Sequence, residues 1–165
     1  MSNLNYRRVK SADQLTEEKA FSKILRLATA CEQSSCKLRA RLLRDGFDEG
    51  VVESALTRAI DYGIVSDARF AESYVRSKLA SGRGCKGIER ELAELGLSAY
   101  ETEAYRDYAE EGEEQELARA VRLLDSRPPR SKNLRDGAFL KLVQQGYSVG
   151  VASCAARIWL DKQSM

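Results

Sequence analysis

The chain has 165 residues, enough for one ordinary domain or a few small modules. Its hydrophobic content of 43% suffices for cores and its charged content of 32% suits exposed helices, while a net charge of only +2 excludes a uniformly basic protein. The N-terminal MSNLNYRRVKSADQ lacks the apolar segment of a signal peptide, and no apolar run approaches the length of a membrane span. We therefore expect a cytoplasmic protein that does not associate with a membrane.

The first third of the chain predicts a polar arm followed by three helices. Residues 1–12 are expected to form a flexible N-terminal arm, and a helix is predicted over 13–30. The second helix is predicted to follow Ser34, a suitable N-cap, and to end at Asp45. The third follows Asp48 and ends at Gly63.

The same order of elements restarts about fifty residues later. Ser66 or Asp67 is expected to cap a helix that ends near Leu79, and two further helices are predicted around 88–95 and 99–109. The acidic stretch EEGEE then separates this second cycle from a third.

The third cycle is interrupted by two prolines. A helix predicted over 115–124 breaks at Pro128–Pro129, because proline lacks a backbone donor and clashes with the preceding turn. Helical patterns resume over 139–143 and 149–160, where Trp159 is expected to anchor the last helix. No stretch shows the alternation typical of a strand.

A repeated phrase links the three cycles. LLRDGF, LAELGL and LVQQGY place glycines at Gly46, Gly96 and Gly146, evenly spaced by 50 residues. Glycine closes a helix in the left-handed conformation, and the next residue then contacts the side chain five positions earlier. This predicts three contacts: Phe47 on Leu42, Leu97 on Leu92, and Tyr147 on Leu142.

A potential N-cap follows each glycine by two positions: Asp48, Ser98 and Ser148. Ser98 also has Glu101 three residues on, which predicts a capping box. The pattern predicts an all-α protein of three tandem three-helix repeats that form an elongated, curved modular body. We assign these repeats to residues 13–64, 65–112 and 113–165.

The stretch GRGCKG, residues 82–87, matches the pattern G-x-G-x-x-G. A dinucleotide site of this kind needs a preceding strand, whereas a helix is predicted here. One alternative is a flexible connector between the first two helices of the second repeat. Another is a basic loop in which Arg83, Lys86 and open backbone amides meet phosphate or carboxylate groups.

The residues that catalysis would need are missing or scattered. Without histidine, Ser-His and Cys-His nucleophile pairs are impossible, and no two carboxylates pair in an apolar setting. The four cysteines are scattered, and without histidine a zinc site would need all of them or carboxylates. They are expected to be reduced, mostly packed thiols: Cys31, Cys36, Cys85 and Cys154. We expect no catalytic residues, no cofactor and no metal.

Basic clusters are the more informative feature. Lys37, Arg41 and Arg44 share a helical face, with Arg39 nearby. They are either solvated or contacts for an acidic protein surface or a phosphate backbone. Two further runs allow the same two interpretations: Arg76, Lys78, Arg83, Lys86 and Arg90, and then Arg127, Arg130, Lys132 and Arg135.

The stretch IDYGIVSDARFAESYVRSKLASGRGCKGIERELAELGLS, residues 60–98, resembles the middle repeat of the RecX family, bacterial modulators of the RecA recombinase. The matching positions are Tyr62, Gly63, Asp67, Arg69, Phe70, Ala71, Gly82, Gly84, Ile88, Glu91, Leu92 and Gly96. Departures are Cys85, where the family usually has proline, Glu94 and Leu95, where a basic residue is common, and Lys37, where glutamate would complete a capping box.

The resemblance implies a monomeric, non-enzymatic regulator that binds RecA and the RecA filament on single-stranded DNA. It further implies inhibition of recombinase, ATPase and coprotease activities, direct DNA contact in some cases, and a role in DNA repair and the SOS response. Our hypothesis is that the basic residues of the first repeat and the run from Arg76 to Arg90 make the electrostatic contacts. The alternatives are a helical DNA-binding protein that acts without RecA, and a passive scaffold for another partner.

Overall fold

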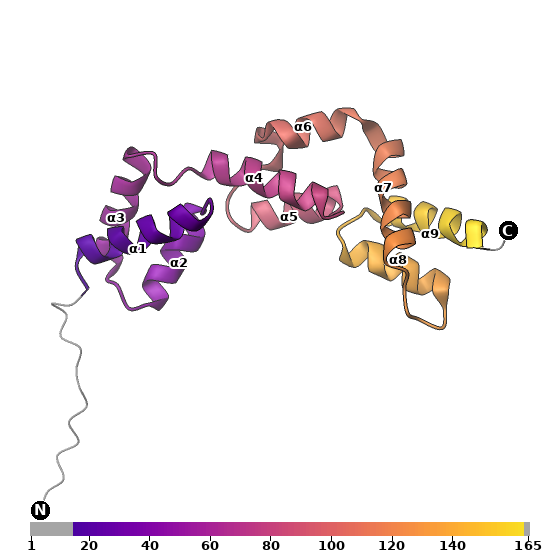
Figure 1. Cartoon of the computed structure of the whole chain (residues 1–165), viewed down its shortest axis with the longest axis horizontal. Helices are drawn as coiled ribbons and strands as arrows, with labels where there is room; N and C mark the ends of the chain where they lie inside the picture. Colours follow the sequence, from indigo (N-terminus) through magenta and orange to yellow (C-terminus); the bar gives the residue numbers. More distant parts are fainter. Residues whose placement is uncertain (1–14, 164–165) are drawn as a thin grey trace, which may run out of the picture. The chain divides into compact units, whose positions relative to one another are not determined.

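The computed structural model of the chain describes residues 15–163. The predicted N-terminal arm and the predicted first residues of the first helix lie outside this range. Within it, the regular structure is entirely helical, and the chain divides into two compact units, one up to Ser66 and one from Asp67 onward (Figure 1). The prediction of an all-α protein built from three-helix repeats is confirmed, whereas the repeat boundaries stay predictions.

The first unit holds the first repeat, which consists of α1 (Glu17–Ala30), α2 (Ser35–Arg44) and α3 (Glu49–Asp61). α3 packs against both α1 and α2. The core between them is closed by fully buried aliphatic side chains, among them Ile24 and Leu42, whose removal from water stabilises the repeat. Two predicted caps are confirmed here: Ser34 accepts from the amide of Lys37 at 3.2 Å, and Asp48 accepts from that of Gly50 at 2.9 Å.

The second unit begins with the second repeat. Its helices are α4 (Asp67–Ala80), α5 (Cys85–Ala93), the short 3₁₀ helix η2 (Ala99–Glu101) and α6 (Glu103–Glu110). α4 contacts α5, η2 and α6, and their shared core includes Val75, Ile88 and Leu92, all fully buried.

The third repeat completes the second unit with α7 (Gly112–Ser126), α8 (Leu134–Gln144) and α9 (Val149–Gln163). α9 packs against both α7 and α8 (Figure 1). Trp159 is only 3% exposed in this core, which confirms its predicted role as an anchor of the last helix. The chain leaves the helical conformation between Ser126 and Leu134, as the two prolines predict.

The repeated glycine closes a helix in all three repeats. Gly46, Gly96 and Gly146 have φ of +91°, +73° and +86°. The amide of the following residue donates to the carbonyl five positions back, at 3.2 Å for Phe47 and Leu42, 2.9 Å for Leu97 and Leu92, and 3.1 Å for Tyr147 and Leu142. Each pair also shares a hydrophobic cluster, so the predicted closure is confirmed three times.

The prediction of a capping box at Ser98 and Glu101 is wrong. Ser98 makes no side-chain cap bond, because η2 intervenes before the next α-helix. Thr102 caps α6 instead, by accepting from the amide of Tyr105 at 3.3 Å. The carboxylate of Glu72, from α4, accepts from the amide of Glu103 at 2.8 Å and so satisfies a second free donor of that helix end.

Among the helices of residues 15–163, none is long and apolar enough to cross a membrane.

Candidate partner-binding surface

The segment GRGCKG is a packing surface between the second and third repeats. The amide of Gly84 donates to the carbonyl of Gln145, and that of Gly87 donates to the carbonyl of Gly146, both at 2.9 Å. The amide of Cys85 donates to the carboxylate of Glu116 at 3.0 Å. These amides are therefore engaged within the chain. The interpretation as a flexible connector is wrong, and so is the expectation of open amides. The loop does meet carboxylates, but these belong to the chain itself: Glu116, Glu91 and Glu89.

The close approach of the two backbones explains why glycines stand there. A Cβ at Gly84 would lie 2.5 Å from the carbonyl carbon of Gly146, and a Cβ at Gly87 would lie 2.9 Å from the Cα of Gly146. Neither distance allows a side chain, so the contact requires glycine on both sides. The hydroxyl of Tyr147 adds a hydrogen bond to the carbonyl of Gly82 at 3.0 Å.

Arg83 belongs to this junction. Its guanidinium donates to the carbonyl of Gln144 at 2.7 Å and pairs with the carboxylate of Glu91, and its side chain is only 16% exposed. Glu91 also accepts from the hydroxyl of Tyr74 at 2.6 Å. Burial raises the pKa of Glu91, but the Tyr74 hydrogen bond and the charge of Arg83 outweigh it, so that the pKa is lowered overall.

The rest of the basic run in the second repeat is largely paired within the chain. Arg76 lies 2.7 Å from Glu72, Lys78 lies 3.6 Å from Glu91, and Lys86 lies 2.8 Å from Glu89. Arg90 is exposed and makes no ion pair with any residue in the described range. The run therefore presents fewer available cations than its sequence indicates.

The basic cluster of the first repeat also contains both paired and exposed side chains. Arg39 pairs with Glu49 at 2.6 Å and with Glu53, two residues of α3, and these bonds raise its pKa. Arg41 and Arg44 are exposed on α2 and have no ion-pair partner among the described residues. Lys37 is exposed as well.

Of the three basic clusters, the run in the third repeat has the largest share of side chains that are exposed and form no ion pair within the described chain. Its four side chains are exposed and form no ion pairs within the part of the chain that the structure covers: Arg127, Arg130, Lys132 and Arg135.

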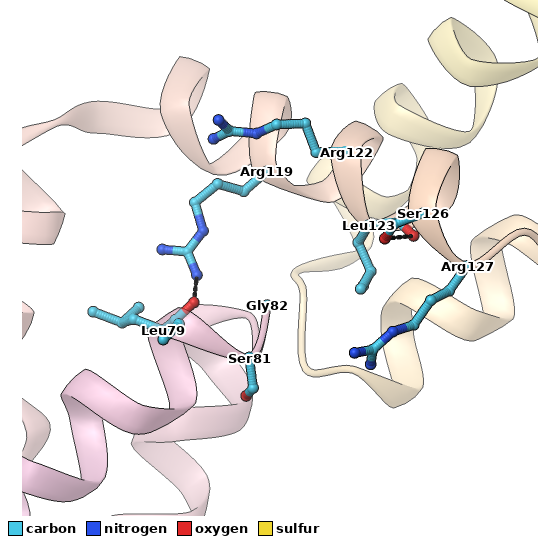
Figure 2. A pocket seen from close by; sticks show the side chains of 9 residues that line it. Leu79, Ser81, Gly82, Arg119, Arg122, Leu123, Ser126 and Arg127 are labelled. Carbon is cyan, nitrogen blue, oxygen red and sulfur yellow. Dashed lines mark hydrogen bonds between the residues drawn. The ribbon is translucent and has the colours of Figure 1, made fainter.

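An open groove of about 350 Å³ adds two arginines that sequence reasoning missed. Figure 2 shows Arg119 extending from α7 to the C-terminal turn of α4, with Leu123 between it and Arg127. The guanidinium of Arg119 donates to the carbonyl of Leu79 and lies 4.5 Å from the ring centroid of Tyr108, while Arg122 is exposed. In the sequence, the three-residue spacing of Arg119 and Arg122 on one predicted helix could have indicated a shared basic face.

The cysteines are all free thiols. Burial, reinforced by the negative charge of Glu116, raises the pKa of Cys85 to about 12. Cys31, Cys36 and Cys154 are exposed, so the expectation of mostly packed thiols is wrong. No group of three or more potential metal ligands occurs within residues 15–163.

The fold and surface define an all-helical protein of three-helix repeats that exposes many basic side chains. Residues 66–104 match the family model described as RecX, second three-helix domain. The Regulatory protein RecX of Mycobacterium sp. (strain KMS) is 34% identical over 146 residues, which cover 82% of this chain and 79% of that relative. The chain belongs to the RecX family of regulatory proteins.

Two further similarities agree with this membership. The Regulatory protein RecX of Syntrophotalea carbinolica is 48% identical over 64 residues, 39% of this chain and 42% of the relative. A crystal structure of RecX from Lactobacillus salivarius shares the fold, with a TM-score of 0.62 at 17% identity over 87% of this chain and 96% of that one.

Proposed function

We propose that the chain binds RecA and its filament on single-stranded DNA, and inhibits the recombinase, ATPase and coprotease activities. It would thereby modulate DNA repair and the SOS response in the cytoplasm, without catalysing a reaction itself. The observation that carries the proposal is membership of the RecX family of regulatory proteins. A series of small helical repeats, each with exposed basic side chains, suits a binding role because separate repeats can contact separate sites on a polymer.

We propose that the predicted basic residues contribute unequally. A cation that already pairs with a carboxylate in the chain gains less from an acidic partner, because the existing pair must be broken. The weaker contributors are then Arg39, Arg76, Lys78, Arg83 and Lys86. The stronger contributors are Arg41, Arg44, Arg90, Arg127, Arg130, Lys132 and Arg135, while Lys37 is exposed and stays a predicted contact.

The exposed arginines also support the second candidate, a DNA-binding protein that acts without RecA. The two functions differ in what the protein binds. We expect fluorescently labelled protein to bind RecA filaments on single-stranded DNA at least about tenfold more tightly than the same DNA without RecA, because the filament adds protein contacts. The measurement is a titration followed by fluorescence anisotropy at several salt concentrations.

Equal affinity for filament and naked DNA, with the same steep loss of binding in salt, would favour direct DNA binding and contradict the RecA proposal.

A further inference from the structure

A second groove lies in the third repeat between the proline loop and α8. It has a volume of about 790 Å³ and is lined by Pro128, Pro129, Arg130, Leu140 and Lys141, among others. It adjoins the groove of Figure 2, because Ser126 and Arg127 line both. Together they run from the C-terminal end of α4 past the end of α7 to α8, and we name them the α7–α8 groove.

The wall of this groove is fixed by contacts to α8. The ammonium group of Lys141 donates to the carbonyl of Arg127 and lies 3.4 Å from the carbonyl of Pro128. Gly137 lets the loop approach the helix, since a Cβ there would lie 2.7 Å from the Cβ of Ser131. The groove is thus preformed, and a preformed site lowers the entropy cost of binding a ligand.

The floor of the groove is apolar and exposed. Leu140, which lines the groove from α8, is 55% exposed, and the exposed Pro128 and half-buried Pro129 continue the apolar lining. The repeat architecture does not require a large apolar residue at the position of Leu140, because the matching position of α5, fifty residues earlier, is Arg90. Exposed apolar surface beside two prolines is typical of a binding site for a polypeptide.

The walls of the groove carry one sign of charge. No aspartate or glutamate of the described chain lines it. The basic lining residues are Arg119, Arg122, Arg127, Arg130 and Lys141. In a chain with 25 acidic residues this segregation favours an anionic ligand.

We propose that the α7–α8 groove binds a short acidic polypeptide segment that carries a large apolar side chain. The carboxylates pair with Arg127 and Arg130, and the apolar side chain packs on Leu140 and the prolines. Single-stranded nucleic acid fits less well, because it is commonly held by aromatic side chains that stack on bases, and no aromatic side chain of the described residues lines the groove. The proposal rests on the proposed function in that RecA would present the segment.

The test uses a defined probe with the full-length protein. The probe is a short fluorescein-labelled peptide in which two leucines are set among aspartates, and binding is followed by fluorescence anisotropy. Three comparison probes are the same peptide with both leucines replaced by serine, the same peptide with lysine for aspartate, and labelled oligothymidylate. We expect the first peptide to bind at least about tenfold more tightly than any of these.

Two variants locate the site. Leu140→Gln removes the large apolar side chain without changing the charge of the groove, and this exposed helix position should tolerate glutamine. Arg130→Glu reverses one wall charge. Each should weaken peptide binding about tenfold or more. The matched control is Leu25→Gln, at a leucine of α1 that is 45% exposed and belongs to the other unit; the affinity of this variant should equal that of the unsubstituted protein.

The proposal is overturned if neither Leu140→Gln nor Arg130→Glu weakens binding, if the serine peptide binds as tightly as the leucine peptide, or if oligothymidylate binds more tightly than the peptide. Inhibition of the RecA ATPase, measured on the same samples, separates the two proposals. Inhibition without peptide binding rejects only the groove, and peptide binding without inhibition rejects only the RecA function.

Discussion

Gly84→Ala should destabilise the second unit by about 2–3 kcal/mol, because the new methyl group would overlap the backbone of Gly146. Gly84 has an ordinary φ of −75°, so the cost arises from the lost junction and not from backbone strain. Trp159 is the single tryptophan of the chain and is buried in the third repeat, so its fluorescence reports on that repeat. The measurement is urea unfolding followed by this fluorescence.

The matched control is Gly96→Ala. Gly96 follows the other end of the same helix, α5, with φ +73°, but a Cβ there meets nothing within 4 Å. It should cost only the strain of a left-handed alanine, about 1 kcal/mol. Equal costs for the two variants would contradict a glycine junction between the repeats.

The second large effect is on RecA inhibition. Replacing Lys37, Arg41 and Arg44 by glutamate together should raise the concentration needed for half-inhibition of the RecA ATPase about tenfold or more, because reversed charges repel an acidic surface. All three side chains are exposed, so unfolding free energy should change by less than about 1 kcal/mol. The measurement is an ATPase titration alongside a urea melt.

A triple variant with the same charge change elsewhere provides the control: Lys19, Arg106 and Arg157, which are exposed and outside the predicted clusters. Inhibition that is equally weakened in both triple variants would show a net-charge effect and reject a contact role for the first repeat. Full inhibition by the Lys37–Arg44 variant would reject it as well.

Local patterns in the sequence predicted most of the fold. The closures at Gly46, Gly96 and Gly146 need only backbone geometry and one adjacent apolar residue, both visible in a short window. The cap at Ser98 failed because a single 3₁₀ turn moved the start of the helix to Thr102. Such a turn depends on tertiary contacts, here the carboxylate of Glu72 from another helix.

The candidate site was harder to predict because charge availability depends on distant pairs. Arg83 and Arg90 look alike in sequence, yet Arg83 is held by Glu91 and by a carbonyl 61 residues away, while Arg90 is exposed. Likewise, the glycines of GRGCKG satisfy a backbone contact with Gly146 that no local pattern shows. The residue type alone does not show whether a basic side chain or a glycine makes a contact within the chain or lies on the free surface; the fold decides this.

The most direct measurement of the proposed function is the ATPase rate of RecA on single-stranded DNA, titrated with this protein. We expect half-inhibition at well below one molecule per RecA protomer, because a protein that binds the filament affects many protomers from one site. An unchanged rate at stoichiometric amounts would contradict a filament-directed regulator.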